Sequence, residues 1–174
     1  MAVETPGQAD AIVRLLNSRP HATPVLPDRL DTADTAAEIL RPFGLFAKEL
    51  GGVRAVRADL MAVLEAATAA EADKAWAELS DHVAGVSHRQ VFSSAGVELE
   101  QVSGDDLVGG ITRAVAELVA AGQWTRVRIC ANDICRGVFY DTTRSRTQRW
   151  HSYELCGNKS NVAAHRARKH QETA

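Results

Sequence analysis

The feature that most constrains this chain is a group of three cysteines and one histidine near its C-terminal end. They follow the spacing Cys-x4-Cys-x15-His-x4-Cys, and the residues are Cys130, Cys135, His151 and Cys156. These are all the cysteines of the chain, and an odd number argues against a framework of disulfides. Zinc favours four such ligands in a tetrahedron, and two sequence-local pairs let two short loops close around one ion. The spacing therefore predicts one structural Zn²⁺, and the alternative is three buried, reduced cysteines with a surface histidine.

The segment around these residues has too few large apolar side chains to build a core unaided. Structural zinc contributes about 10–16 kcal/mol in apparent terms, enough to decide whether a small module folds. Between the ligand pairs, the run 138–140 (VFY) predicts a strand of a small hairpin. After the last ligand, Gly157 predicts a tight turn and Asn158 the cap of a following helix. Four protein ligands leave no open position for water, so the zinc is predicted to be structural rather than catalytic.

Charge divides the chain at about the same place. The net charge is −2, but residues 1–123 hold 10 Lys and Arg against 18 Asp and Glu, whereas residues 124–174 hold 10 against 4. Such an asymmetry is typical of a basic module that meets a polyanion. The alternative is that the acidic and basic parts attract one another.

Apolar periodicity upstream of the zinc segment predicts several helices and one hairpin. The predicted helices cover residues 9–17, 32–40, 53–69, 71–84 and 105–121, and the predicted strands cover 89–94, 97–102 and 125–129. Asp31 is predicted to cap the second helix and Asp105 or Gly104 the last one. The fold class is therefore α+β, with a mostly helical domain and β-hairpin over residues 1–123 and a small zinc-bound hairpin-plus-helix module over 124–174.

Basic side chains gather on both parts of the predicted zinc module, the hairpin and a final helix at about 157–170. Such a surface can neutralise several phosphates, and asparagines on the helix can contact base edges if it enters the major groove. The candidate contacts to double-stranded DNA are Arg144, Arg146, Arg149, Asn158, Lys159, Asn161, Arg166, Arg168 and Lys169. The alternative is a solvated basic helix that docks on the acidic body.

The segment RICANDICRGVFYDTTRSRTQRWHSYELCGNKSNVAAHRARKH resembles the CGNR zinc finger. The matching residues are Cys130, Cys135, Phe139, Asp141, Arg144, Ser145, Arg146, Trp150 and the run Cys156-Gly157-Asn158-Lys159. His151 stands where that family usually has cysteine, and Lys159 where it has arginine. Histidine is an acceptable zinc ligand, whereas lysine replaces a planar bidentate donor with a point charge.

The upstream part is similar to the ABATE domain, the usual N-terminal partner of that finger. The similarity lies in LLNSRP, in LDTADTAAEIL and in FGL at 43–45. Together the two resemblances imply a DNA-binding transcriptional regulator of a family described as induced by stress.

Other classes of function have weaker support in the sequence. A zinc-stabilised module that docks a protein partner, without specific binding of nucleic acid, is the main alternative. An enzyme is not expected, because His82 and His88 do not lie beside a carboxylate at a catalytic spacing. Gly109-Gly110 also lacks the Lys-Ser/Thr of a phosphate loop.

Partners and location follow from the same reading. A small-molecule effector of the N-terminal part could be held by Asn17, Arg19 and His21, although capping and turn chemistry is the simpler role for polar loop residues. A homodimer would suit palindromic DNA. The chain shows no apolar stretch of membrane-spanning length and no signal-peptide pattern, so we expect a cytoplasmic protein without membrane partners.

Overall fold

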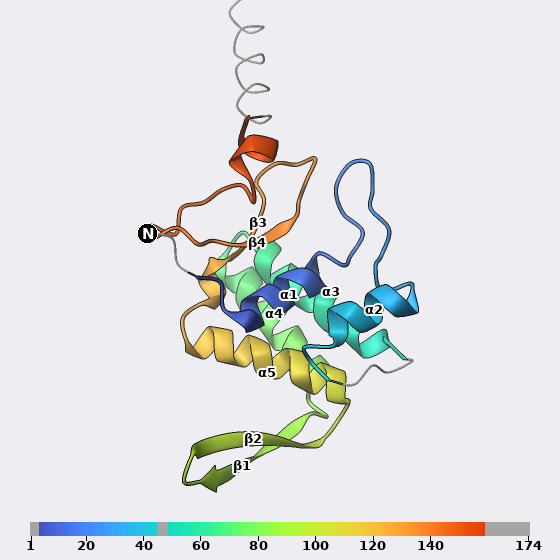
Figure 1. The fold of residues 1–174 in the computed structure, drawn as a ribbon, viewed down its shortest axis with the longest axis vertical. Helices are drawn as coiled ribbons and strands as arrows, with labels where there is room; N and C mark the ends of the chain where they lie inside the picture. Colours follow the sequence, from blue (N-terminus) through green and yellow to red (C-terminus); the bar gives the residue numbers. More distant parts are fainter. Residues whose placement is uncertain (1–3, 45–48, 159–174) are drawn as a thin grey trace, which may run out of the picture.

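The computed structural model describes residues 4–44 and 49–158, and Figure 1 shows the arrangement of the elements. In chain order these are α1 (Gly7–Leu16), α2 (Ala33–Leu40), α3 (Gly51–Glu65), α4 (Ala69–His82), β1 (Ser87–Ser93), β2 (Gly96–Ser103), α5 (Asp106–Ala120), a 3-10 turn η1 (Trp124–Arg126), β3 (Val127–Ile129), β4 (Val138–Tyr140) and a π-helical turn η2 (Tyr153–Gly157). The mixed helix and strand class predicted from the sequence is confirmed. In the described ranges, no helix is both long and apolar enough to cross a membrane.

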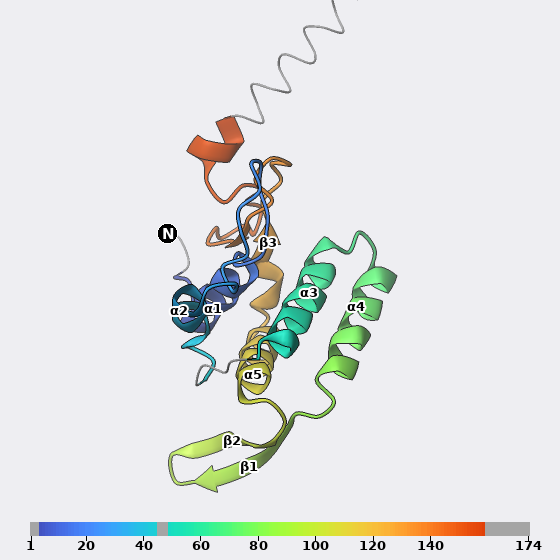
Figure 2. The ribbon, with the colours of Figure 1, turned by 90° about the vertical axis from the view of Figure 1, so that its right-hand side faces the viewer.

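The five α-helices of the described ranges enclose one apolar core. Val53, Val56 and Leu60 of α3 are almost fully buried, as their helical spacing predicts. Helices α3 and α4 lie side by side (Figure 2), and α1 contacts α2, α3 and α5. Helix α3 likewise contacts α1, α4 and α5, so the helical body is packed around the pair α1 and α3.

Helix α5 closes the body on the side of the first hairpin. Its N-cap is Asp105, one of the two predicted caps, whose carboxylate accepts from the Val108 amide at 2.9 Å. A Cβ at Gly110 would lie 1.8 Å from the carbonyl oxygen of Phe43. The glycine therefore serves close packing of α5 against the chain that follows α2.

The β1–β2 hairpin projects from one end of the body (Figures 1 and 2). Its strands pair antiparallel, with Phe92 opposite Val97 and Gln90 opposite Leu99. Phe92 is 72% exposed, so much of the apolar surface of the hairpin is open to solvent in the described chain.

The β3–β4 hairpin joins the body to the zinc segment. Because side chains alternate along a strand, its two faces have different neighbours. Val127, Val138 and Tyr140 pack into the core of the helical body, whereas Phe139 packs with Cys130 and Cys156. This hairpin is thus shared by both parts, and the division at residue 123 stays a prediction.

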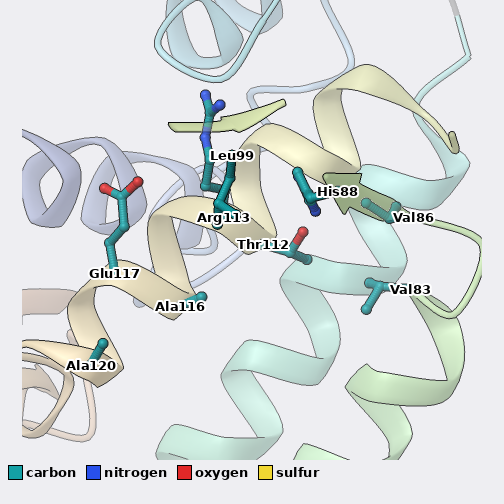
Figure 3. Close-up of a pocket in the computed structure, with 9 residues that line it drawn as sticks. All are labelled: Val83, Val86, His88, Leu99, Thr112, Arg113, Ala116, Glu117 and Ala120. Atoms are coloured by element: carbon teal, nitrogen blue, oxygen red, sulfur yellow. The ribbon is translucent and has the colours of Figure 1, made fainter. Parts of the chain in front are cut away.

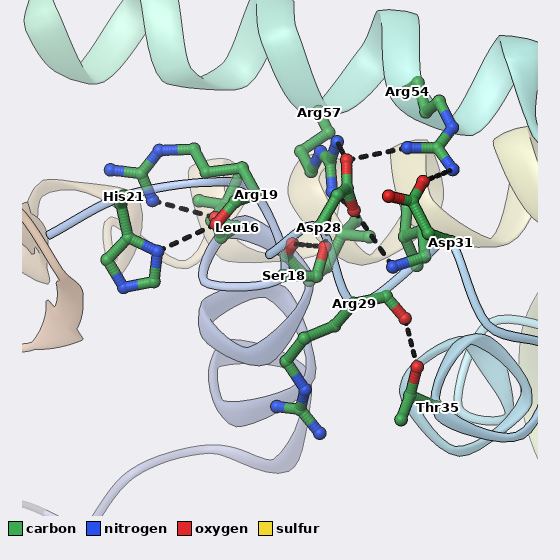
Figure 4. A network of polar contacts seen from close by, with 12 residues as sticks. Leu16, Ser18, Arg19, His21, Asp28, Arg29, Asp31, Thr35, Arg54 and Arg57 are labelled. Carbon is green, nitrogen blue, oxygen red and sulfur yellow. Dashed lines mark hydrogen bonds and ion pairs between the residues drawn. The ribbon is translucent and has the colours of Figure 1, made fainter. Parts of the chain in front are cut away.

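The loop between α1 and α2 is fixed to α3 by charged groups (Figure 4). Arg57 is buried and donates to Asp28 and to the Ser18 hydroxyl, and Arg54 donates to Asp28 and Asp31. Asp31 was predicted to cap α2, and this prediction is wrong: its carboxylate accepts from Arg54 instead. The N-cap of α2 is Thr32, which makes no side-chain capping bond.

Candidate metal centre

The structure brings the two predicted ligand pairs to one point. The Sγ atoms of Cys130, Cys135 and Cys156 and a ring nitrogen of His151 all lie within 4.8 Å of one another. His151 Nδ1 is 3.4 Å from the Cys135 sulfur and 3.6 Å from the Cys156 sulfur. The three cysteines are free thiols. No other group of this kind was found in the part of the chain that the structure describes.

The first pair is held by a tight turn between β3 and β4. The carbonyl of Asn132 accepts from the amides of Cys135 and Arg136, and its side-chain oxygen accepts from the Ile134 amide. Arg136 has φ of 53°, and the Cys130 amide then donates to Gly137 at 2.7 Å. This backbone brings both sulfurs to the same side of the turn.

The second pair is held by η2. The Ser152 hydroxyl accepts from the Leu155 amide, and the Cys156 amide donates to the Ser152 carbonyl at 3.0 Å. Cys156 is therefore already within a helical turn. The predicted tight turn at Gly157 is wrong, since Gly157 belongs to η2. The predicted helix cap at Asn158 is also wrong, since Asn158 follows the C-terminal end of η2 and itself has helical dihedral angles.

Gly157 has a packing role instead. A Cβ at this position would lie 2.8 Å from the Tyr153 ring and 3.2 Å from the Trp150 ring. The two rings are in edge contact, with centroids 6.1 Å apart. The glycine leaves room for this aromatic pair, of which Trp150 packs against Cys130, Phe139 and Cys156.

The distances among these donors fit zinc. With Zn–S bonds of about 2.3 Å and Zn–N bonds of about 2.05 Å, tetrahedral angles place sulfur and nitrogen roughly 3.6 Å apart. The two measured Sγ–Nδ1 distances agree with this value. Three thiols and one imidazole are also the ligands that zinc prefers. The four residues form the site of one structural zinc ion, with Nδ1 as the histidine ligand atom.

Protonation of the site is consistent with a need for a cation. Burial raises the pKa of the Cys135 thiol to about 11, and the neighbouring Cys130 and Cys156 sulfurs add to the shift. Three sulfurs so close together cannot share negative charge without a counterion. Zinc supplies that charge and deprotonates its thiol ligands.

Residues at the end of α1 and in the α1–α2 loop bind the backbone of residues 134–138, which form the metal turn after Cys130 and the start of β4. The Asn17 side chain donates to the Val138 carbonyl at 2.8 Å and accepts from the Val138 amide at 2.7 Å. Arg19 donates to the Arg136 carbonyl, and the Thr23 amide donates to the Ile134 carbonyl. Sequence patterns did not predict this contact, because Asn17 and Val138 are 121 positions apart.

The residues predicted as a small-molecule site are therefore engaged elsewhere. Asn17 and Arg19 are bonded to the metal turn, and His21 Nδ1 lies 2.8 Å from the Arg19 carbonyl (Figure 4). Their partners are backbone groups of the protein itself. The simpler prediction, turn and backbone chemistry, describes them better than a ligand site.

A buried carboxylate organises the segment between β4 and His151. Asp141 is completely buried. Burial disfavours its charge, but hydrogen bonds from Thr143, Gln148 and Arg128 outweigh this and hold its pKa below the ordinary value. Its oxygens accept from the backbone amides of Thr143 and Gln148 at 2.8 and 3.0 Å. The chain from 142 to 149 is thereby fixed as a loop around one ionised group.

Three predicted nucleic-acid contacts lie on this loop. Arg144, Arg146 and Arg149 are exposed. Arg146 donates to the Thr125 hydroxyl, and the Arg149 guanidinium lies 5.2 Å from the centre of the Trp150 ring. Asn158, another predicted contact, is exposed at the end of η2. The remaining predicted contacts fall outside the described residues, as does most of the predicted final helix: Lys159, Asn161, Arg166, Arg168 and Lys169.

These features define a zinc-binding module with a shielded metal site and an arginine-bearing loop. Comparison with known proteins gives it a name: residues 126–169 match the family model of the CGNR zinc finger. The match contains all four ligands and the loop around Asp141. It does not extend upstream of residue 126, so the resemblance of that part to the ABATE domain stays a prediction. Among curated proteins, nothing matches the chain.

Proposed function

We propose that the zinc module binds double-stranded DNA and that the protein acts as a transcriptional regulator in the cytoplasm. The metal has a structural role in this proposal, because all four ligands come from the protein. Its ligands would tie the turn of Cys130 and Cys135 to His151 and Cys156, on either side of the arginine loop at 142–149. No catalytic step is assigned.

The observation that carries the proposal is that the arginines of the described module fall into two groups, which differ in their contacts with the protein. Arg126, Arg128 and Arg136 bind protein groups: the Asp141 and Thr143 carbonyls, the Asp141 carboxylate and Glu65. Arg144, Arg146 and Arg149 are exposed and form no ion pair with a carboxylate in the described chain, although Arg146 donates to the Thr125 hydroxyl and Arg149 lies over the Trp150 ring.

Three exposed guanidinium groups on one anchored loop are suited to phosphate oxygens. The backbone under them is fixed by Asp141, so little ordering entropy is lost when they bind. Residues 124–174 as a whole also carry a positive net charge, because Lys and Arg outnumber Asp and Glu there. Each phosphate contact releases counterions, which makes salt dependence the signature of this mode of binding.

The test is fluorescence anisotropy of the zinc-loaded full chain with a labelled mixed-sequence duplex over a range of salt concentrations. We expect binding at low salt that weakens steeply as salt rises. The variant Arg144→Gln/Arg146→Gln/Arg149→Gln should flatten the log–log slope by about 0.9 for each phosphate that the protein no longer neutralises.

A charge-matched control uses three exposed arginines outside the zinc module, two in the helical body and one on the β1–β2 hairpin, as Arg29→Gln/Arg41→Gln/Arg89→Gln. This control should keep the wild-type slope, because the body is not part of the proposed interface. Equal effects of the two triple variants would contradict the assignment of the loop. Absence of DNA binding at low salt, by protein that holds one zinc, would contradict the proposal itself.

One observation favours the second candidate, a module that docks a protein partner. Ile134 and Leu155 are 58% and 61% exposed at the two ends of the metal site, and Val25 is exposed on the loop bonded to Ile134. Exposed apolar groups of this kind are typical of protein interfaces when they are contiguous. DNA binding that survives Ile134→Ser/Leu155→Ser would separate this surface from the arginine loop.

A further inference from the structure

A groove lies between the β1–β2 hairpin and helix α5 (Figure 3). The hairpin is at the end of the body away from the β3–β4 hairpin and the zinc site (Figure 1). It has a volume of about 430 Å³. This value falls within the range of small-molecule sites, about 300–1,000 Å³. Its walls are mostly apolar and come from Val83, Val86, Leu99, Ala116 and Ala120.

The groove continues along the surface of the helices. A second depression of about 340 Å³ shares Val83, Ala116 and Ala120 with it and extends to Trp76 on α4. The apolar lining therefore runs from the hairpin across α5 to α4. An extended apolar molecule fits this shape better than a compact polar one.

A polar atom on the wall of the groove lacks a partner. The Nε2 atom of His88 is shielded from solvent and has no hydrogen-bond partner among the described residues. A buried polar atom without a partner carries a free-energy cost and calls for an explanation. In Figure 3 the His88 ring lies beside Thr112, on the wall of the groove.

Arg113 supplies positive charge at the same place. Its side chain is exposed, lines the groove and forms no ion pair within the described residues. The other charged residue of the lining, Glu117, keeps its negative charge and accepts a hydrogen bond from the neutral Gln8 side chain at 2.9 Å. Arg113 is therefore the cationic hydrogen-bond donor of the lining.

From these features we propose that the groove binds a small organic acid with an apolar body, such as a medium-chain or aromatic carboxylic acid. The carboxylate accepts hydrogen bonds from Arg113 and, once the His88 ring turns so that Nε2 faces the groove, from His88 as well. The apolar body lies on Leu99, Ala116 and the surface toward Trp76. This site is separate from the zinc module and does not depend on DNA binding. It places the small-molecule partner of the N-terminal part at the hairpin instead of the α1–α2 loop.

The test uses the zinc-loaded full chain with 8-anilinonaphthalene-1-sulfonate as a fluorescent probe and decanoate, decan-1-ol and acetate as competitors. We expect saturable binding of the probe. Decanoate should displace the probe with an apparent affinity about tenfold higher than that of decan-1-ol, because only decanoate carries a negative charge. Acetate lacks the apolar body and should not compete. Chemical-shift changes in an amide NMR spectrum should map to β2 and α5.

Three variants locate the site and two control for it. Ala116→Trp fills the groove and should weaken decanoate at least about tenfold, whereas Ala77→Trp, on an exposed position of α4, should leave binding unchanged. Arg113→Met and His88→Leu should each remove most of the preference for decanoate over decan-1-ol. A further variant, Arg41→Met, is the matched control for loss of one exposed arginine.

Several outcomes would overturn the proposal. Equal affinity of Ala116→Trp and Ala77→Trp for the probe would place binding elsewhere. Equal displacement by decanoate and decan-1-ol in the wild type would exclude recognition of the acid. Absence of probe binding together with a dimer that Ala116→Trp dissociates, seen by sedimentation equilibrium, would show that a second copy of the chain covers the groove.

Discussion

The helical body and the zinc module, two regions of one chain, are stabilised by different forces. In the described residues the main apolar cluster contains 24 buried side chains, from helices α1 to α5, the loops that join them and the inner face of the β3–β4 hairpin. The cluster at the metal site contains three buried residues, Cys130, Phe139 and Cys156, of which two are ligands. The body has a hydrophobic core, whereas the core of the module is the metal site itself.

This difference has a consequence for cooperativity. Apolar burial is spread over many side chains, so the body loses stability in increments when single residues change. The module depends on four bonds to one ion, so the loss of one ligand removes most of its stability at once. The two regions meet at the β3–β4 hairpin and at the hydrogen bonds between Asn17 and Val138. These contacts determine how much a loss of stability in one region lowers the stability of the other.

The sharpest way to separate the two regions is to remove a zinc ligand. Cys156→Ser should lower zinc affinity by more than about 100-fold, since even partners outside the ligand set contribute up to that factor. Residues 130–157 should then lose amide protection in hydrogen exchange, while α5 keeps it. Ile134→Ser, an exposed non-ligand in the same module, should keep one zinc per chain. Equal loss of protection in α5 would show that both regions fold as one unit.

The converse change creates a cavity in the body. Ile111 is fully buried in α5, and Ile111→Ala should cost about 2–5 kcal/mol of unfolding free energy. The folded protein should still hold one zinc, because no ligand is near the cavity. Urea denaturation measures the cost, and zinc content is measured by atomic emission. Val119→Ala is the control, since Val119 is half exposed on the same helix and its loss should have little effect.

The same contrast explains what could be predicted from the sequence. Buried positions such as Leu60 and Ile111 follow helical periodicity, and the four zinc ligands follow a spacing fixed by metal chemistry. Both signals are local. Periodicity also gave the helices to within a few residues of their observed ends.

Other features depend on contacts between distant segments. Aspartate is a common residue at helix N-caps, but the Asp31 carboxylate binds Arg54, and no local rule identifies that partner. Asn17 is hydrogen-bonded to Val138 across 121 positions. The cap predicted at Asn158 is wrong because a helical turn begins before Cys156, at a Ser152 cap that was not predicted. Tertiary contacts thus outweighed local preference where the two regions join.

The Asn17 contact can be used to measure the coupling. Asn17→Ala leaves the Val138 amide and carbonyl without their partner, at a cost of about 1–3 kcal/mol. We expect both a lower urea midpoint for the body and faster release of zinc to a chelator. Asn17→Asp keeps the acceptor and loses the donor, so its effect should be smaller. A change in only one of the two measurements would mean that the regions are energetically independent.

The smallest expected effect concerns pH and is confined to the body. His82 Nδ1 lies 2.6 Å from the buried Asp59 carboxylate, and this hydrogen bond and the Asp59 charge raise the pKa of His82 above 6.5. A raised pKa in the folded state means that the stabilisation is fully present below pH 6.5 and is lost as pH rises through the folded pKa. The contribution is small because the His82 side chain is exposed.

Hydrogen exchange at α4 reports this effect apart from the pH dependence of zinc binding. After correction for intrinsic exchange rates, wild-type protection at α4 should decrease relative to His82→Gln as pH rises above 6.5. The two proteins should become equal once His82 is neutral, and protection of residues 130–157 should differ little between them at any pH. An unchanged difference at α4 across this range would mean that the charged His82–Asp59 pair does not join α3 to α4. A pH response that remains above pH 6.5 would then point to the metal site, where thiolate ligands compete with protons for zinc.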